Sequence, residues 1–337
     1  MVEPVQPASL GSWGAQAGLG VTVDPTKPGW TTAEPGVRPA GAIHARVGAL
    51  VSAARPRQWV KSGLVFAAPI AALAAGQRVD IAGVVVAGLL FCAISSGIYM
   101  LNDAADCEAD RRHPRKSLRP VASGRISRNS AAAAGAVLVL MATGTALGAG
   151  MPALGEILAV YAGVNLAYSL GLKRVPLLEL LCVSAGFVLR AVAGGAAGRI
   201  PISGWFLLVV CSGSLLVAVG KRTAEIATLP GEGRSHRAVL RWYRLPGLAL
   251  MRYLFATVTV VAYGGWTLTR LPFVDDPRGD WPLLAVSLVP FTVAVVAIER
   301  ALAKGQGGAP EEIPFKSRLL QGAAAAWLMV FVLAAVT

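Results

Sequence analysis

The chain contains a succession of long apolar stretches, and this pattern restricts it to a fold built from membrane-spanning helices. About 20 apolar residues cross the hydrocarbon core of a bilayer as one helix. Nine such stretches lie near residues 62–78, 80–101, 129–149, 152–170, 175–197, 202–220, 247–268, 281–303 and 318–336. The composition, with 55% hydrophobic and 15% charged residues, is also too apolar for an average soluble domain. We therefore expect an all-α, polytopic membrane bundle of about nine transmembrane helices.

The first 45 residues have a different composition. They contain six Pro and seven Gly, few charges and no repeating apolar face, so they lack the side chains that build a packed core. No basic residue precedes Lys27, which argues against an N-terminal signal peptide. We expect a disordered N-terminal tail over 1–45 and a single transmembrane domain over 46–337.

The distribution of Lys and Arg predicts the orientation of the chain in the membrane. The segment 46–61 and the loops after the even-numbered spans hold 23 of these residues, whereas the alternate loops hold four. This bias predicts a multi-pass protein of the plasma membrane whose basic loops face the cytoplasm. The net charge of +13 is therefore mostly a matter of topology, and we expect no nucleic-acid partner. The sequence is compatible with a homo-oligomer.

The stretch LNDAADCEADRRHPRKSLRP at 101–120 concentrates charge directly after an apolar span. Asn102, Asp106 and Asp110 recur every four residues, a spacing that lines them along one side of a helix, and Asp103 lies beside them. Clustered carboxylates repel one another unless a cation neutralises them. Mg²⁺ suits such a site because it binds one or two carboxylates and completes its shell with water and phosphate oxygens.

Basic residues follow the acids at once, at Arg111, Arg112, Arg115, Lys116 and Arg119. A metal surrounded by several cations is what a polyphosphate ligand requires. The alternative is an ordinary polar cap where a helix leaves the membrane, which a single Asp would suggest but this density of charge does not. We therefore expect a Mg²⁺ site made of Asn102, Asp103, Asp106 and Asp110.

The segment NDAADCEADRRHPRKSLRP resembles the first aspartate-rich motif of the UbiA superfamily of intramembrane prenyltransferases. Four further motifs, RPRQWVKSGLVFAAPIAA (55–72), YSLGLKR (168–174), GFVLRAVAGG (186–195) and GKRTAE (220–225), resemble one branch of that superfamily. Members of this branch transfer a 5-phosphoribosyl group from phosphoribosyl diphosphate to decaprenyl phosphate, on the route to cell-wall arabinan. The resemblance runs from about Arg55 to the C-terminus. It implies a UbiA-like catalytic domain, dependence on Mg²⁺, and catalytic roles for Asp103, Asp106 and Asp110.

The loop after the sixth span separates this branch from the aromatic prenyltransferases of the superfamily. The latter typically carry a second aspartate-rich motif there, whereas this loop offers Glu225 among basic residues, namely Lys221, Arg222, Arg234, Arg237, Arg241 and Arg244. That composition suits a further phosphate better than a second metal. Transfer of a prenyl group from prenyl diphosphate to an aromatic acceptor is the alternative function, and a transporter or membrane scaffold is a more distant one.

Several other positions are candidates for substrate binding. The resemblance implies contacts with substrate phosphates for Asn102 and Arg119 and also for Lys61, Tyr168, Lys173, Lys221 and Arg222. Arg190 lies about fifteen residues into its span, where an isolated guanidinium is unfavourable and by default functional. We expect it to contact phosphate or Glu179, while the sequence assigns no role to Glu179 or Glu225. The four Cys and three His show no metal-binding spacing.

Overall fold

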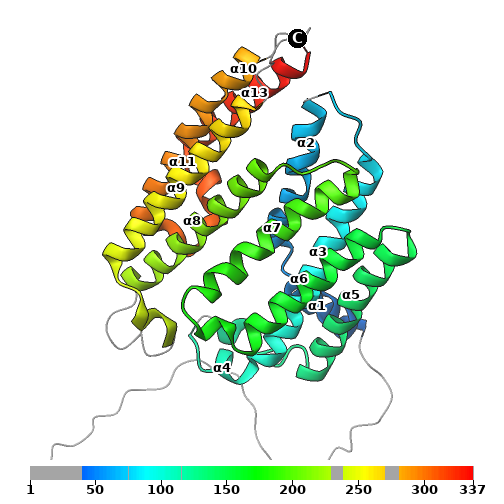
Figure 1. The fold of residues 1–337 in the computed structure, drawn as a ribbon. Helices are drawn as coiled ribbons and strands as arrows, with labels where there is room; N and C mark the ends of the chain where they lie inside the picture. The colour runs from blue at the N-terminus through cyan, green and yellow to red at the C-terminus, as the bar shows by residue number, and fades with distance from the viewer. Residues whose placement is uncertain (1–39, 75, 115, 229–237, 270–280, 337) are drawn as a thin grey trace, which may run out of the picture. The chain divides into compact units, whose positions relative to one another are not determined.

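The computed structural model describes residues 40–74, 76–114, 116–228, 238–269 and 281–336. All regular structure in this part of the chain is helical, which confirms the expected all-α fold (Figure 1). The predicted disordered tail lies outside the described residues up to position 39. Helix α1 (Ala40–Ala54) begins within the last six residues of that predicted tail.

Seven helical segments in the described ranges are long and apolar enough to cross a membrane. They are α3 (Ile81–Ala105), α5 (Arg128–Gly148), α6 (Pro152–Leu170), α7 (Leu178–Gly198), α8 (Gly204–Thr228), α9 (Leu245–Leu268) and the stretch Leu284–Ala303, which joins the end of α10 (Trp281–Val286) to α11 (Leu288–Ala303). These segments lie where the sequence predicts spans, although α8 continues beyond residue 220, its predicted end. The chain is therefore a multi-pass membrane protein.

The first and last predicted spans differ from a single long α-helix. The first is divided into the 3₁₀-helix η1 (Pro56–Phe66) and the short α2 (Ala67–Ala74). Because a 3₁₀-helix rises about 2.0 Å per residue and an α-helix about 1.5 Å, the apolar part of the two, residues 62–74, reaches roughly 22 Å, less than the roughly 30 Å of a hydrocarbon core. The last is α13 (Arg318–Val336), whose apolar part Arg318–Leu333 is shorter than the other spans. These two segments account for the difference between seven clear spans and the nine predicted.

Short helices connect the membrane segments. They are α4 (Cys107–Arg111), η2 (Lys116–Leu118), η3 (Leu172–Arg174), η5 (Ala238–Trp242), η6 (Gln306–Gly308), η7 (Pro310–Glu312) and α12 (Ile313–Lys316).

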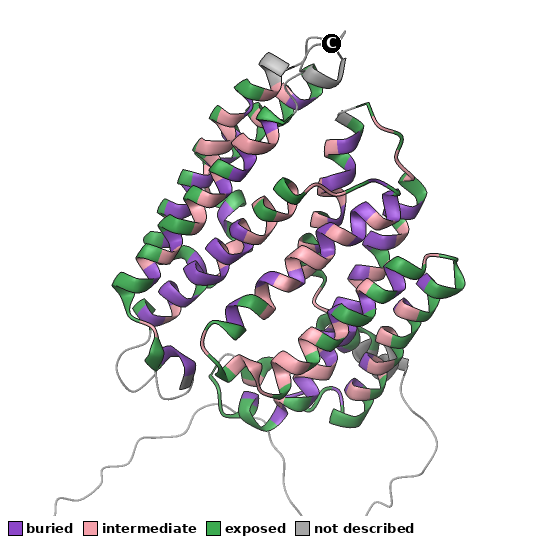
Figure 2. Ribbon diagram, in the orientation of Figure 1, coloured by how far each residue is buried: buried purple, intermediate pink, exposed green. Residues whose placement is uncertain are grey.

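Helices α3 and α7 are the most buried spans, with 56% and 50% of their most apolar windows inside the protein (Figure 2). Glycines let their neighbours approach closely. A Cβ atom at Gly97 of α3 would lie 2.7 Å from the carbonyl oxygen of Gly135 in α5, and one at Gly194 of α7 would lie 1.8 Å from that of Val65 in η1. Backbone therefore packs directly on backbone at both contacts.

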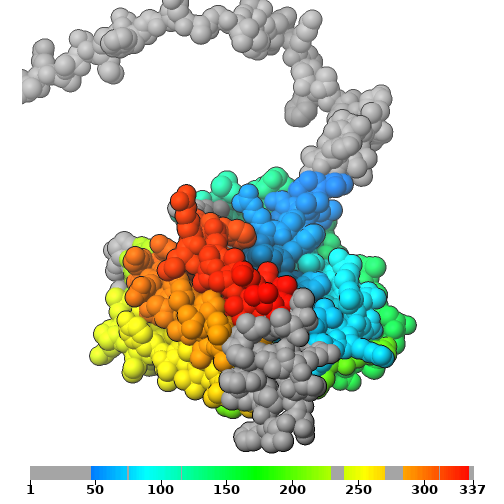
Figure 3. Space-filling model, turned by 90° about the horizontal axis from the view of Figure 1, so that it is seen from above, coloured from blue at the N-terminus to red at the C-terminus, as the bar shows by residue number. Residues whose placement is uncertain are grey.

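The first and last membrane segments are neighbours. Helix α13 packs against α2, and Figure 3 shows the C-terminal helices, in red and orange, beside the chain that follows the tail, in blue. The 3₁₀-helix η1 itself packs on α3 and α7. The residues just before η1 consequently lie beside the end of α3, where the acidic stretch begins.

Candidate active site

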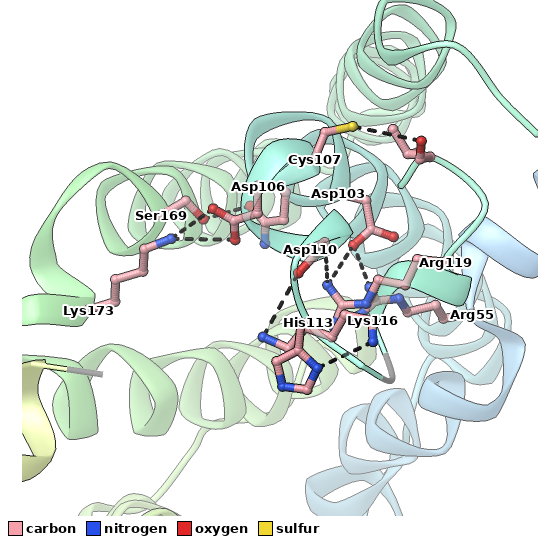
Figure 4. Close-up of polar contacts among 12 residues, drawn as sticks. Arg55, Asp103, Asp106, Cys107, Asp110, His113, Lys116, Arg119, Ser169 and Lys173 are labelled. Atoms are coloured by element: carbon pink, nitrogen blue, oxygen red, sulfur yellow. Dashed lines mark hydrogen bonds and ion pairs between the residues drawn. The ribbon is translucent and has the colours of Figure 1, made fainter. Parts of the chain in front are cut away.

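The acidic stretch does not form one continuous stripe, so the expectation that Asn102, Asp106 and Asp110 line one helix face is wrong. Helix α3 ends at Ala105, and Asp106 has φ −90° and ψ 7°, outside the α-helical range, before α4 begins at Cys107. Two separate groups result. Asp103 and Asp110 share Arg119, whereas Asp106 lies beside Lys173 (Figure 4). Asn102 belongs to the second group through its hydrogen bond with Ser169. The backbone N–H of Asp106 and that of Asp110 still donate to the carbonyls four residues earlier, so the two groups differ in the partners of their side chains more than in the path of the backbone.

The first group is a buried pair of carboxylates held by guanidinium groups. Asp103 and Asp110 are only 2% and 3% exposed. Nη1 of Arg119 lies 3.2 Å from Oδ1 of Asp103 and 2.5 Å from Oδ2 of Asp110, so one guanidinium bridges both acids. Arg55 donates a second hydrogen bond to Oδ1 of Asp103 at 2.5 Å, and Nζ of Lys116 lies 3.9 Å from Asp110. Three cations thus surround two buried acids.

The second group joins the end of α3 to the end of α6. Lys173, on η3, donates to Oδ1 and Oδ2 of Asp106 at 3.1 and 3.4 Å. Ser169, near the end of α6, donates its hydroxyl to Oδ1 of Asn102 at 2.6 Å. Asp106 is much more exposed than the buried pair, with 45% of its side chain accessible. This group therefore presents a carboxylate and an ammonium at the surface of the bundle.

The acidic residues suit a Mg²⁺ site in which the substrate supplies some of the ligands. Among the described residues no three His, Cys, Asp or Glu side chains are grouped closely enough to hold a metal by themselves. Oδ2 of Asp103 is nevertheless buried without a hydrogen-bond partner, which leaves one carboxylate oxygen available to a ligand. Since Mg²⁺ typically takes one or two protein carboxylates and completes its shell with water and phosphate oxygens, a larger protein cluster is unnecessary.

Arg222 lies in a buried ion-pair network that gives Glu179 and Glu225 their roles. Its Nε and Nη2 lie 2.7 and 2.5 Å from the two oxygens of Glu179, and its Nη1 lies 2.5 Å from Oε2 of Glu225. Arg222 is 2% exposed and Glu179 fully buried. This differs from the predicted contact with substrate, because the guanidinium is directed at protein carboxylates. The network holds α7 against α8.

Tyr243, just after η5, supports the start of α7. Its hydroxyl accepts a hydrogen bond from the backbone N–H of Leu177 at 3.0 Å, and Leu177 has the unusual φ of 65°. Burial, reinforced by the negative charge of Glu179, raises the pKa of Tyr243. The phenol therefore stays protonated at neutral pH and fixes the short link that leads from Lys173 to α7.

Arg190 contacts polar groups inside the membrane and does not reach Glu179, so the predicted Arg190–Glu179 contact is wrong. The two residues are eleven positions, or about 16 Å, apart along α7. Arg190 donates to the carbonyl of Gly186 and to the hydroxyls of Ser95 and Tyr161 at 2.8, 2.9 and 2.8 Å. Its guanidinium carbon also lies 4.8 Å from the centroid of the Tyr161 ring. Within the described residues it forms no ion pair, so its charge is balanced only by these dipoles and ring faces.

The remaining candidates lie on the elements that the sequence predicts. Lys61 is half-buried within η1, Tyr168 is half-buried two residues before the end of α6, and Lys221 is exposed on α8. Whether they contact substrate stays a prediction.

Two residues that contact the acidic centre, Arg55 and Ser169, are not among the site residues predicted from the sequence. Arg55 is one of the basic residues of 46–61 that predict the orientation in the membrane, but it bonds to Asp103, 48 positions away. Ser169 carried no signal of its own beyond its place in the motif YSLGLKR. The one local clue to Arg55 is that it opens the motif RPRQWVK, directly before a proline.

The chain is similar in sequence to known proteins. Residues 63–274 match the sequence profile of the UbiA prenyltransferase family. The chain is 41% identical over 292 residues to a decaprenyl-phosphate phosphoribosyltransferase of Mycolicibacterium smegmatis, covering 84% of this chain and 91% of that protein. It is 39% identical over 289 residues to a protein of the same name from Corynebacterium glutamicum, covering 85% and 86%.

A solved structure shares the fold at low sequence identity. The UbiA homolog from Archaeoglobus fulgidus bound to GPP and Mg²⁺ superimposes with a TM-score of 0.59 at 15% identity, over 84% of this chain and 99% of that one. At this identity the likeness concerns the arrangement of helices alone.

Proposed function

Because the chain belongs to the UbiA prenyltransferase family, we propose that it transfers the 5-phosphoribosyl group of phosphoribosyl diphosphate to a polyprenyl phosphate such as decaprenyl phosphate. The observation that carries this proposal is the buried pair Asp103 and Asp110, bridged by Arg119 and flanked by the Asp106–Lys173 ion pair. Acids for a divalent ion and cations for phosphates lie together at the end of α3. The names of the two relatives point to the same reaction.

The proposed reaction breaks the bond between C1 of ribose and the diphosphate and forms one from C1 to an oxygen of the acceptor phosphate. Negative charge accumulates on the departing diphosphate while the ribose ring becomes oxocarbenium-like. The main task of the protein is therefore charge stabilisation. Arg119, Lys173 and Lys221 would supply cations to the phosphates. Mg²⁺, which one or two of the acids Asp103, Asp106 and Asp110 would hold with Asn102, would neutralise further charge on the diphosphate when bound.

The acceptor needs no general base, because its phosphate is already an anion. Lys61, Tyr168 and Arg190 complete the proposed substrate-binding set. The positive-inside distribution supports a cytoplasmic site in the plasma membrane, where a water-soluble donor meets the basic loops. The isoprenoid tail of the acceptor would lie between apolar spans, and the product would serve the synthesis of cell-wall arabinan.

Transfer of a prenyl group to an aromatic acceptor is less well supported. A second metal site would need acids in the loop after α8. Glu225, in the last turn of α8, is paired with Arg222 at 2.5 Å, and Glu232, in the loop, lies outside the described residues. The carboxylate of Glu225 is thus already neutralised by the buried guanidinium of Arg222.

The test is a paired transfer assay with purified protein and Mg²⁺. One tube contains labelled phosphoribosyl diphosphate and decaprenyl phosphate, and the other contains labelled prenyl diphosphate and an aromatic acid. The proposal expects label in the lipid fraction of the first tube and no prenylated aromatic product in the second. Product only in the second tube would show that the chain is an aromatic prenyltransferase instead. No transfer in either tube would contradict both proposed reactions.

A further inference from the structure

Arg55 has a backbone conformation that its sequence disfavours. Its φ and ψ are 53° and 62°, in the left-handed region, and it directly precedes Pro56. A side chain with a Cβ rarely adopts this region, and a following proline restricts the backbone further. No capping hydrogen bond from its side chain to η1 explains the conformation. Such strain is commonly retained where the position of a functional side chain depends on it.

The conformation places the guanidinium of Arg55 in the acidic centre. It donates to Oδ1 of Asp103 at 2.5 Å, and its Cζ lies 4.9 Å from the centroid of the Tyr99 ring. The side chain is still 27% exposed. Two contacts thus fix the group while part of it stays accessible to a ligand.

The side chains around Asp103 carry a net positive charge, which favours the binding of an anion. Arg55, Lys116 and Arg119 carry three positive charges against the two negative charges of Asp103 and Asp110. Oδ1 of Asp103 already accepts from two guanidinium groups, whereas its buried Oδ2 has no partner. A surplus positive charge beside an available oxygen suits an anion that arrives with a divalent cation.

We propose that Arg55 is a donor-binding residue, whose guanidinium contacts an oxygen of the donor diphosphate while it orients Asp103. This inference rests on the proposed function, since it specifies a contact with the donor of that reaction. It assigns Arg55 to the donor and gives it no contact with the acceptor lipid. Removal of Arg55 should therefore weaken donor binding selectively.

The experiment compares Arg55→Gln and Arg55→Lys with the matched control Arg57→Gln, which removes an exposed arginine of the same segment. Binding of phosphoribosyl diphosphate with Mg²⁺ to the full-length solubilised protein is measured by calorimetry without acceptor, and KM for each substrate is measured in the transfer assay. We expect Arg55→Gln to raise the donor Kd and KM roughly 10- to 100-fold, as for loss of a charged hydrogen bond. Arg55→Lys should recover part of the loss, and Arg57→Gln should change either constant less than about twofold.

A purely structural role of Arg55 predicts another result. Arg55→Gln would then lower the unfolding temperature and kcat, while the donor Kd stayed within twofold of wild type. That outcome would overturn the inference. If Arg55→Gln yields no folded protein, the donor Kd of Arg55→Lys decides, and an unchanged value overturns it. Inorganic diphosphate with Mg²⁺ separates this inference from the proposed function. Weaker diphosphate binding by Arg55→Gln, in a protein that transfers no phosphoribosyl group, would reject the reaction and retain the anion contact.

Discussion

Lys173 and Asp106 are 67 positions apart in the chain, yet Nζ of Lys173 lies 3.1 Å from Oδ1 of Asp106 (Figure 4). The contact joins the break after α3 to the turn after α6, so two chain reversals meet at one end of the bundle. The exposed Asp106 is thereby paired with Lys173, while Arg119 is paired with the buried acids. A ligand with several phosphates would find both charges within one site.

Lys173→Gln should weaken binding of the donor. Loss of one ammonium from a polyphosphate site is expected to raise KM for phosphoribosyl diphosphate about tenfold. KM for the lipid acceptor should change much less. Arg174→Gln is the matched control, because Arg174 is exposed on the same short helix η3. Equal effects of the two substitutions would show that overall charge, and not the position of Lys173, matters.

Asp106→Asn and Asp110→Asn should each abolish measurable transfer, with a loss on the order of 100-fold or more, because each removes a proposed ligand of the metal–diphosphate complex. Both variants should fold, since Asp106 is half-exposed and Asp103 still balances Arg119 in Asp110→Asn. Glu108→Gln provides the control, as Glu108 is exposed and pairs with Arg111. Thermal unfolding with and without Mg²⁺ checks folding and metal binding. Activity retained in both Asn variants would contradict the metal assignment.

Glu179→Ala should destabilise the protein because it leaves the buried Arg222 with Glu225 as its remaining carboxylate partner. Breaking a buried ion pair from one side typically costs about 3–5 kcal/mol. The double variant Glu179→Leu with Arg222→Met should recover much of this loss, since it removes the buried charges together. Unfolding in detergent, followed by thermal or chemical denaturation, measures the difference. If the double variant retains full donor affinity, Arg222 makes no essential contact with substrate.

Gly194→Ala should disrupt the contact between η1 and α7. The added Cβ would lie 1.8 Å from the carbonyl oxygen of Val65, so backbone must shift. We expect a loss of roughly 1–3 kcal/mol of stability, as for overpacking of a core. Gly144→Ala is the control, because no heavy atom lies within 4 Å of its added Cβ. That substitution should be neutral or stabilising by up to about 1 kcal/mol.

The sequence predicts the membrane helices well because each depends on a long local run of apolar residues. Helix α6, predicted at 152–170, spans Pro152–Leu170. The same logic fails for η1, because apolar composition does not distinguish a 3₁₀-helix from an α-helix. Its packing on α7, with Val65 against Gly194, is a contact that no local pattern reveals.

The sequence predicts which types of residue form the site, but not which of these residues pair with one another. The spacing of Asn102, Asp106 and Asp110 favours one helix face, and nothing local in the sequence signals the interruption at Asp106. Its partner Lys173 and the bridge by Arg119 are contacts between distant segments. Arg55 was missed for the same reason, since a basic residue at a membrane boundary usually needs no further explanation.

The 3₁₀ form of η1 has a consequence for the lipid environment of the protein. An α-helix of the same eleven residues would be shorter by about 5 Å. Rewinding of this segment would draw α2 and Arg55, which lies just before the other end of η1, toward each other. Bilayer thickness should therefore bear on activity through this one segment, and thicker membranes should favour the extended form.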